Sequence, residues 1–298
     1  MTNLKPLKLI YNDKAGSRAF KNDLDNIIQI FTQAGFDINI LRTTTIHDID
    51  HHLSHTPPHH FHTIVAAGGD GTINAVVNAM MRHGIKSRLG IIPAGTANDF
   101  ARFLHIEKPY TQAAQVIAGG YTTPCDLGRI GDNYFINVLG VGDITNVSTH
   151  VDTQLKNTMG NMAYYLKAVE KLGTLAPVPI TIKNSQGTIT EDIHFFLALN
   201  TGGAGGFDNI APKATINDGK LDMIAIKHTN IADILTLIMK FFKGEHIDDY
   251  NVIYFQDNYT ELIFDSKVET NVDGEAGPQG PLTIQVVPNA IQIYTKEI

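Results

Sequence analysis

A glycine-rich turn between a strand pattern and a helix pattern constrains this chain more than any other feature. Thr63 to Ala67 has the pattern of a buried strand and runs into Gly68-Gly69-Asp70-Gly71-Thr72, after which Asn74 to Arg82 has a helical pattern. Glycine lets the backbone approach a phosphate closely, and the free N–H groups at a helix N-terminus attract anions. The segment predicts a phosphate-binding turn, with Thr72 as a helix cap and Asp70 placed to orient magnesium or water. The alternative is an Asp-Gly turn that only joins strand to helix.

A second segment repeats this arrangement. Residues 93–102 follow the short strand pattern Leu89–Ile92 and contain Gly95, Thr96 and Asp99. Gly95 permits a tight backbone, Thr96 could cap a helix and touch phosphate, and Asp99 adds a second carboxylate near the strand ends. The alternative is that Thr96 is only an N-cap and Asp99 only a favourable charge in the first turn of a helix.

Strand and helix patterns alternate over the first 125 residues. Leu7–Tyr11 and Phe36–Leu41 fit strands, and Lys21–Gln33 fits a helix. This alternation predicts an α/β nucleotide-binding domain with a parallel sheet over residues 1–125, with ligands at the carboxyl ends of its strands.

From Asp126 onward, short apolar or alternating runs predict a β-rich antiparallel sandwich domain over residues 126–287. Residues 288–298 are a candidate segment for completing the first domain. The expected strands are 134–141, 178–183, 194–200, 221–226, 251–256, 261–264, 282–287 and 291–294, and the expected helices lie near 162–172 and 231–242. No Gly/Ser linker separates the halves, which predicts a rigid cleft between them.

These segments, in this order, resemble the lipid kinase family that contains diacylglycerol kinases and sphingosine kinases. The resemblance covers nearly the whole chain. It extends to Gly205-Gly206 through Ala211-Pro212, to the Asp-Gly-x-Leu pattern in residues 217–222, and to Val272-Asp273-Gly274-Glu275. The Gly-Gly-Asp-Gly-Thr turn alone is also found in NAD kinases, so the ordered set carries the resemblance. It implies an α/β nucleotide domain and a β-rich domain with ATP in the cleft between them.

The resemblance also implies site residues. Glu275 is the expected acceptor of the proton from the lipid hydroxyl, with Asp273 beside it, and Asp70, Asp99 and Asp273 are expected to manage metal and water. The expected structural magnesium ligands are Thr215, Asp218 and the backbone carbonyl of Lys220, which are oxygen donors suited to a hard cation. The expected nucleotide-binding residues are Asn12, Asp13, Lys14, Ala15, Gly16, Thr43, Gly68, Gly69, Asp70, Gly71, Thr72, Ile73, Asn74 and Thr96.

The implied function is ATP- and Mg²⁺-dependent phosphorylation of a lipid hydroxyl, most simply diacylglycerol to phosphatidic acid. Three alternatives stay open: a kinase of another lipid alcohol, an NAD-kinase-like phosphotransferase, and a catalytically silent nucleotide- or lipid-binding regulator. The last is suggested by Ala75, which stands where the family usually has glutamate.

The net charge and the hydropathy of the sequence limit the partners that we expect for this protein. The formal net charge of -7 argues against nucleic acid. The longest apolar stretch, Ile231–Phe242, is too short to span a bilayer, so the lipid is expected to be met at a membrane surface. A single cysteine, Cys125, and the absence of a signal-peptide pattern suit a cytoplasmic protein that works peripherally at the inner membrane face. Free strand edges in the β-rich domain make a homodimer a further hypothesis.

Two other features have competing interpretations. Six histidines between His51 and His62 are expected to form a polar loop rather than a metal site, because they lack ordered ligand spacing. Apolar residues at helical spacing in 231–242, flanked by Lys240 and Lys243, are explained by core packing, with membrane docking as the alternative.

Overall fold

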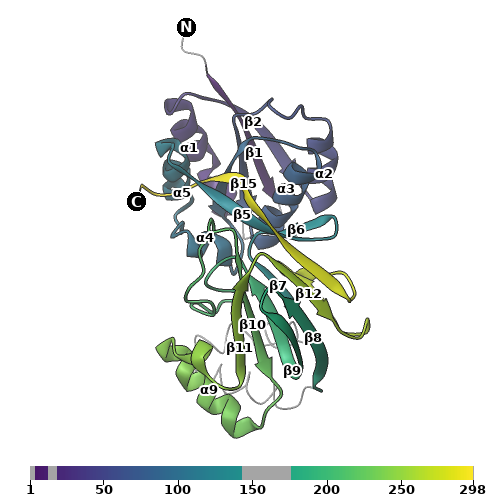
Figure 1. The fold of residues 1–298 in the computed structure, drawn as a ribbon. Helices are drawn as coiled ribbons and strands as arrows, with labels where there is room; N and C mark the ends of the chain where they lie inside the picture. Colours follow the sequence, from purple (N-terminus) through teal and green to yellow (C-terminus); the bar gives the residue numbers. More distant parts are fainter. Residues whose placement is uncertain (1–3, 13–18, 143–175, 298) are drawn as a thin grey trace.

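A single mixed sheet runs through the molecule and joins its two halves. The computed structural model describes residues 4–12, 19–142 and 176–297, and its strands follow the order β14-β13-β7-β9-β8-β12-β15-β4-β3-β1-β2, with β10, β11, β5 and β6 branching from this path. Figure 1 shows the parallel strands and their helices at one end of the molecule and the antiparallel strands at the other. The predicted fold class, an α/β domain followed by an antiparallel β-rich domain, is confirmed.

The first half is a parallel sheet covered by helices. Its elements are β1 (Lys5–Asn12), α1 (Ala19–Gln33), β2 (Phe36–Thr43), α2 (Ile46–Ser54), β3 (Thr63–Gly68), α3 (Asp70–Arg82), β4 (Arg88–Pro93), α4 (Asp99–Phe103) and α5 (Tyr110–Gly119). Figure 1 shows α1 and α5 on one side of the sheet and α2 and α3 on the other. Every residue of β3 is buried, as expected for a central strand of a parallel sheet covered on both faces.

Helices α2, α4 and α5 of this half were not predicted. Helix α2 carries few apolar residues but is stabilised by a capping box in which Thr45 and Asp48 bond to each other's backbone N–H. The prediction of a polar loop is therefore wrong for His51 and His52, which lie in this helix.

Helix α3 begins at Asp70 rather than Asn74, with Gly69 as its N-cap. Thr72 is thus the third residue of the helix and not its cap.

The second half is built from antiparallel strands. Its elements are β5 (Thr122–Ile130), β6 (Asn133–Phe135), β7 (Val138–Val141), β8 (Val178–Asn184), β9 (Gly187–Leu199), β10 (Leu221–Lys227), α9 (Ile231–Lys243), the 3₁₀ helix η1 (His246–Asp248), β11 (Val252–Asp257), β12 (Tyr259–Ile263), β13 (Thr270–Val272), β14 (Glu275–Ala276) and β15 (Leu282–Tyr294). The helix predicted near residues 162–172 lies outside the described residues.

Strand β15 connects the two halves. It pairs antiparallel with β12 and β5, and near its end Ile293 pairs in parallel with Leu89 of β4. The hydroxyls of Tyr294 and Thr63 lie 2.7 Å apart in the core of the first half. The two strands expected at 282–287 and 291–294 are one strand with an irregularity between Val287 and Ile291.

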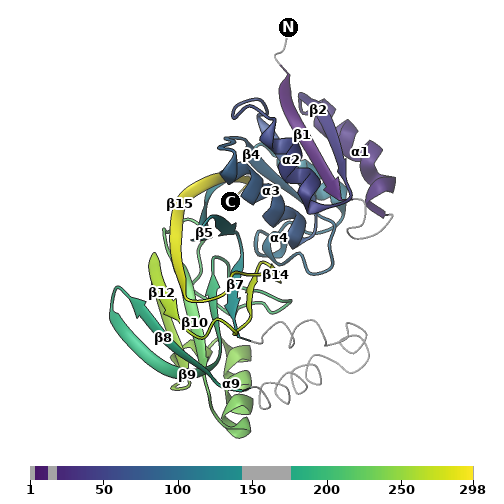
Figure 2. The ribbon, with the colours of Figure 1, turned by 90° about the vertical axis from the view of Figure 1, so that its right-hand side faces the viewer.

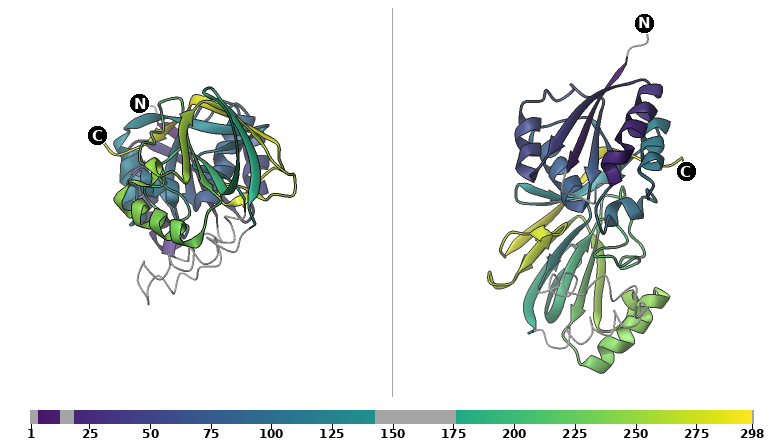
Figure 3. Two further views of the ribbon diagram at one scale, coloured as in Figure 1. Left: turned by 60° about the horizontal axis from the view of Figure 1, so that its bottom comes forward. Right: turned by 180° about the vertical axis from the view of Figure 1, so that it is seen from behind.

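Helix α9 lies far from the parallel sheet, as Figures 1 and 3 show. Its N-cap Asn230 accepts a hydrogen bond from the Asp233 amide, and Gly244 ends it with a positive φ of 72°. None of the helices in the described ranges is long and apolar enough to cross a membrane.

Candidate functional site

The carboxyl ends of β1 to β4 bring the predicted nucleotide residues to one edge of the sheet. Asn12 is paired with Thr43, and Gly68 with Pro93, in the parallel register. Thr43 is buried, and its hydroxyl donates to the carbonyl oxygen of Tyr11 at 3.3 Å. This edge is where open α/β sheets bind ligands. The predicted residues Asp13, Lys14, Ala15 and Gly16 lie outside the described residues.

The two glycine-rich segments touch each other. A Cβ atom added to Gly69 would lie only 3.2 Å from the Cα of Gly95, so both backbones need glycine to approach this closely. Asn98 shapes the second loop, because its side chain accepts from the Gly95 amide at 2.8 Å and donates to the Gly95 carbonyl at 2.9 Å. Asn98 is also the N-cap position of α4, so the alternative role of Thr96 as that N-cap is wrong. Thr96 is exposed.

Asp70 and Asp99 lie near each other at the start of two helices. Burial and the negative charge of Asp99 raise the pKa of Asp70. Oδ1 of Asp70 accepts a long hydrogen bond of 3.4 Å from the Phe100 amide. Two buried carboxylates that repel each other form a place where a cation is favoured.

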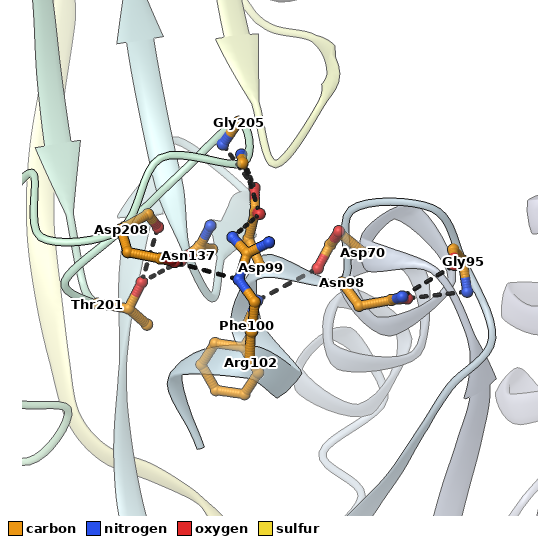
Figure 4. A network of polar contacts seen from close by, with 12 residues as sticks. Asp70, Gly95, Asn98, Asp99, Phe100, Arg102, Asn137, Thr201, Gly205 and Asp208 are labelled. Atoms are coloured by element: carbon orange, nitrogen blue, oxygen red, sulfur yellow. Dashed lines mark hydrogen bonds and ion pairs between the residues drawn. The ribbon is translucent and has the colours of Figure 1, made fainter. Parts of the chain in front are cut away.

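Asp99 also joins the halves of the molecule, as Figure 4 shows. It accepts hydrogen bonds from the Gly205 amide at 2.5 Å and the Gly206 amide at 3.1 Å. Arg102 bonds to Asp99 at 2.7 Å and reaches Asp208 at 3.1 Å. The segment after β9 is therefore held on α4 through Asp99, a role that its place in the sequence does not reveal.

Asp273 is buried at the centre of a hydrogen-bond network. Its two oxygens accept from the amides of residues 136, 137 and 138 at 2.8, 3.0 and 2.7 Å, and from the side chain of Asn74 at 2.6 Å. Burial raises its pKa to about 6, while these donors act in the opposite direction. The network explains why the strand predicted at 134–141 is interrupted between β6 and β7: three successive amides turn toward one carboxylate.

Glu275 reaches the glycine turn from the opposite half of the molecule. It follows Asp273, with φ of 50°, and Gly274, with φ of 94°, in a tight turn between β13 and β14. Its Oε1 would lie 3.2 Å from a Cβ added to Gly71, the second residue of α3. Figure 2 shows β14 beside the parallel domain near α4.

A cavity of about 580 Å³ connects these groups. Asp70, Asp99, Asp273 and Glu275 line its polar part. Most of its remaining wall is apolar and comes from the second half of the molecule: Val138, Phe195, Leu197, Ile210, Ile224, Ile226, Ile234, Leu237, Ile238 and Phe241. These strand and helix residues have patterns typical of ordinary core, so the sequence analysis did not identify them as site residues.

The predicted metal ligands lie on a separate turn. Asp126, fully buried, accepts from the Gly219 amide at 2.7 Å and donates its own amide to Ile216, which fixes this turn. Asp218 is exposed and accepts from the Lys220 amide at 3.0 Å. Burial raises the pKa of Asp222, and the charge of nearby Asp218 adds to this. This excess of negative charge and the oxygen donors fit a hard cation. Within the described residues, no group of three or more His, Cys, Asp or Glu side chains is placed to hold a metal ion.

Comparison with known proteins identifies the family. A model of the "Diacylglycerol kinase catalytic domain" matches residues 6–130, and a model of the "YegS C-terminal NAD kinase beta sandwich-like domain" matches residues 138–295. A diacylglycerol kinase of Bacillus subtilis (strain 168) is 37% identical over 279 residues, covering 93% of this chain and 92% of that protein. The chain belongs to the diacylglycerol kinase family.

Other members agree with this assignment. The diacylglycerol kinase of Staphylococcus carnosus (strain TM300) is 32% identical over 291 residues, which cover 98% of this chain and 95% of that protein. A crystal structure of a diacylglycerol kinase from Bacillus anthracis str. Sterne shares the fold, with a TM-score of 0.81, 23% identity and coverage of 99% of this chain and 98% of that one. As a member of this family the protein is a lipid kinase, which uses ATP. The predicted family resemblance is confirmed.

Proposed function

We propose that this diacylglycerol kinase family member transfers the γ-phosphoryl group of ATP to the free hydroxyl of diacylglycerol, giving phosphatidic acid. One observation carries the proposal. The carboxylate of Glu275 lies against Gly71 at the start of α3, and both line a cavity whose other walls are largely apolar. A general base, a phosphate-binding turn and space for hydrocarbon therefore meet in one place.

The nucleotide phosphates would lie on the glycine turn. Thr72 and Ile73 donate the first backbone hydrogen bonds of α3 to the Gly69 carbonyl oxygen. The N–H groups that precede them at the start of the helix have no carbonyl acceptor one turn back, so they would be directed at phosphate oxygens. Asp70 and Asp99 would hold a divalent cation beside them, since each carboxylate raises the cost of ionising the other and a cation offsets this repulsion. Bound Mg²⁺ supplies positive charge that stabilises the transferring phosphoryl group.

Glu275 would take the proton from the acceptor alcohol. The hydroxyl oxygen forms a bond to the γ-phosphorus, the bond from that phosphorus to the oxygen of ADP breaks, and the hydroxyl proton passes to the Glu275 carboxylate. Asp273 acts through Glu275 instead of touching substrate, because its oxygens already accept four hydrogen bonds. It would be a positioning residue for the turn that carries Glu275.

The apolar wall favours a lipid over NAD as acceptor. Side chains such as Leu197, Ile224 and Leu237 offer no hydrogen bonds to a ribose or a nicotinamide. They would instead bury acyl chains, with a gain of about 0.8 kcal/mol for each CH₂ group removed from water. Phosphatidylglycerol and sphingoid bases also carry hydrocarbon chains, so the choice among lipids is decided by the assay below.

The test is transfer of labelled phosphate from ATP to single lipids and to NAD. Diacylglycerol should be phosphorylated faster than phosphatidylglycerol, a sphingoid base or NAD. Glu275→Gln should lower kcat by about a hundredfold, the lower end of the usual contribution of a general base. ATP bound by the protein with no turnover on any acceptor would identify a silent regulator instead.

A matched control is Glu261→Gln. Glu261 lies on β12 on the surface, where it accepts from Tyr259 and pairs with Lys183 at 3.5 Å, away from the cavity. The activity of Glu261→Gln should equal that of the parent. Full activity in Glu275→Gln would remove the role assigned to Glu275.

A further inference from the structure

Helix α9 has apolar side chains on two faces, and among the residues that the structure describes only one of these faces is buried. Ile234 and Leu237 are 2% and 8% exposed and line the cavity together with Ile238 and Phe241. On the adjoining side of the helix, Ile231 and Met239 are 53% and 51% exposed and Leu235 is 39% exposed. We call these three residues, Ile231, Leu235 and Met239, the outer stripe.

The outer stripe follows one line along the helix. Its members are four residues apart, so they lie one above the other on a single face about 12 Å long. The apolar residues expected to form one stripe in the sequence are therefore divided between two faces, apart from Phe242, whose side chain lies outside the described residues. A contiguous exposed apolar surface rimmed by polar residues is typical of a protein or membrane interaction site, whereas single exposed apolar residues are not.

We propose that the outer stripe inserts into the surface of a lipid bilayer, so that α9 lies flat on the membrane that holds the substrate. This inference rests on the proposed function, because it takes the cavity lined by α9 as the place of the acyl chains. The outer stripe and the cavity face adjoin on one helix, whose whole diameter is only about 10 Å. A lipid that leaves the bilayer beside α9 would therefore reach the apolar part of the cavity without crossing water.

Side chains in the last turn of α9 and in the segments that precede and follow it suit an interface between water and lipid. Lys243 is exposed in the last turn of α9. Tyr250 is 85% exposed, and the ammonium group of Lys227 lies 4.3 Å from the centroid of its ring. Tyrosine and lysine at the edge of an apolar surface are typical of segments that rest at headgroup level. Figures 1 and 3 show that α9 lies at one end of the molecule, so the parallel domain would not obstruct contact with a flat membrane.

Acidic side chains near α9 offset its basic ones, which bears on whether apolar insertion or charge attraction drives membrane binding. Asp249 pairs with Lys240 at 2.7 Å, and Glu245 and Asp248 are exposed just beyond the helix. The local charge is thus mixed, and apolar insertion should dominate over attraction to anionic lipid. Binding should consequently persist on neutral phosphatidylcholine vesicles and in high salt.

The experiment compares a triple variant, Ile231→Gln/Leu235→Gln/Met239→Gln, with the parent. Glutamine is a good helix former, so the exposed face should keep its structure. Flotation measures binding to phosphatidylcholine vesicles that contain about 5–10 mol% diacylglycerol. The bound fraction should fall at least about tenfold, and the rate on vesicle diacylglycerol should fall with it.

A second substrate separates membrane docking from catalysis. Dihexanoylglycerol dissolves as monomers, so the triple variant should phosphorylate it within about twofold of the parent rate. A matched control carries Ile40→Gln and Ile263→Gln, which remove two exposed isoleucines on β2 and β12 that are 42% and 43% exposed. This control should bind vesicles as the parent does.

Three results would overturn the inference. The first is a triple variant that binds vesicles like the parent, and the second is a triple variant that loses equal activity on both substrates. The third is a parent that light scattering shows to be a dimer while the triple variant is a monomer, since a second copy would then cover the stripe. If the parent fails to phosphorylate any diacylglycerol, the proposed function is wrong, but flotation still decides whether the stripe binds membrane.

Discussion

The side-chain amide of Asn74 donates a 2.6 Å hydrogen bond to Oδ2 of Asp273, which lies 199 residues later in the chain. The same amide donates to the carbonyl oxygen of Tyr134 at 3.1 Å. Helix α3, which begins at the glycine-rich turn, is thereby fixed to the turn that carries Glu275. The position of the expected base relative to the expected phosphate site depends on this contact.

Removing the Asn74 side chain should loosen that connection. We expect Asn74→Ala to lower the free energy of unfolding by about 2 kcal/mol, because a buried carboxylate loses one of its donors. The kinase rate should fall as well, since the Glu275 turn would no longer be held in place. Urea unfolding and initial rates measure the two effects. Asn133→Ala, on the exposed hairpin between β5 and β6, serves as the control and should change neither.

Adding one methyl group at Gly71 should separate activity from stability. In Gly71→Ala the new Cβ would lie 3.2 Å from Oε1 of Glu275, so the carboxylate must shift. Because misplacement of a reacting group by about 1 Å can cost a hundredfold, we expect kcat to fall at least about tenfold. The melting temperature should stay the same or rise, since alanine favours helix over glycine.

The control for Gly71→Ala is Gly119→Ala. Gly119 ends α5, where a new Cβ would lie 3.8 Å from Tyr121, an ordinary van der Waals distance. This variant should match the parent in rate, with a melting temperature that is the same or higher, since alanine favours helix over glycine here too. Unchanged kcat in Gly71→Ala would show that Glu275 does not act at the position proposed.

The stability of the fold should depend on the protonation of Asp273. Burial raises the pKa of this carboxyl to about 6 in the folded protein, against 3.8 ordinarily. A raised folded pKa means that the folded state binds the proton more tightly, so the stability contributed is present below pH 4 and lost as the pH rises through 6. Between pH 5 and pH 7.5 the loss should be about 1 kcal/mol.

The measurement is urea unfolding of the parent and of Asp273→Asn at both pH values. Asparagine does not titrate, so the parent should lose about 1 kcal/mol more than the variant on going from pH 5 to pH 7.5. The opposite sign would mean that the four hydrogen-bond donors outweigh burial and hold the pKa of Asp273 below its ordinary value.

A magnesium ion at the Asp218 turn should stabilise the folded protein. A cation bound only by the folded state raises the melting temperature in proportion to the logarithm of its concentration. We expect 10 mM MgCl₂, which is a hundredfold excess over a site with a Kd of about 10⁻⁴ M, to raise the melting temperature of the parent more than that of Asp218→Asn. Asp132→Asn, on the exposed turn before β6, is the control. Equal shifts in all three proteins would exclude Asp218 as a ligand.

Local features of the sequence were sufficient to predict most strands and helices of the first half. The buried run Thr63–Gly68 and the glycines that follow it specify their own conformation through side-chain hydrophobicity and backbone freedom. Helix α2 was missed because it is short and rich in His and Asp: of its described side chains only Ile49 and Leu53 are buried in the core, and the Thr45 capping box fixes its start. The single strand β15 was predicted as two strands, 282–287 and 291–294, because an irregularity between Val287 and Ile291 interrupts its alternation.

The sequence by itself determined the alternating strands and helices of the first half, the glycine-rich turn and the family. The first two depend on residues close together in the chain, and the family depends on the order of short motifs along it. Only the tertiary structure decided that Asp273 is buried under four donors while Glu275 reaches Gly71, and that one face of α9 lines the cavity while the other stays exposed. Those properties come from contacts between residues far apart in the chain. Burial and hydrogen bonding of this kind depend on how strands such as β13 and β7 pair, which no local pattern specifies.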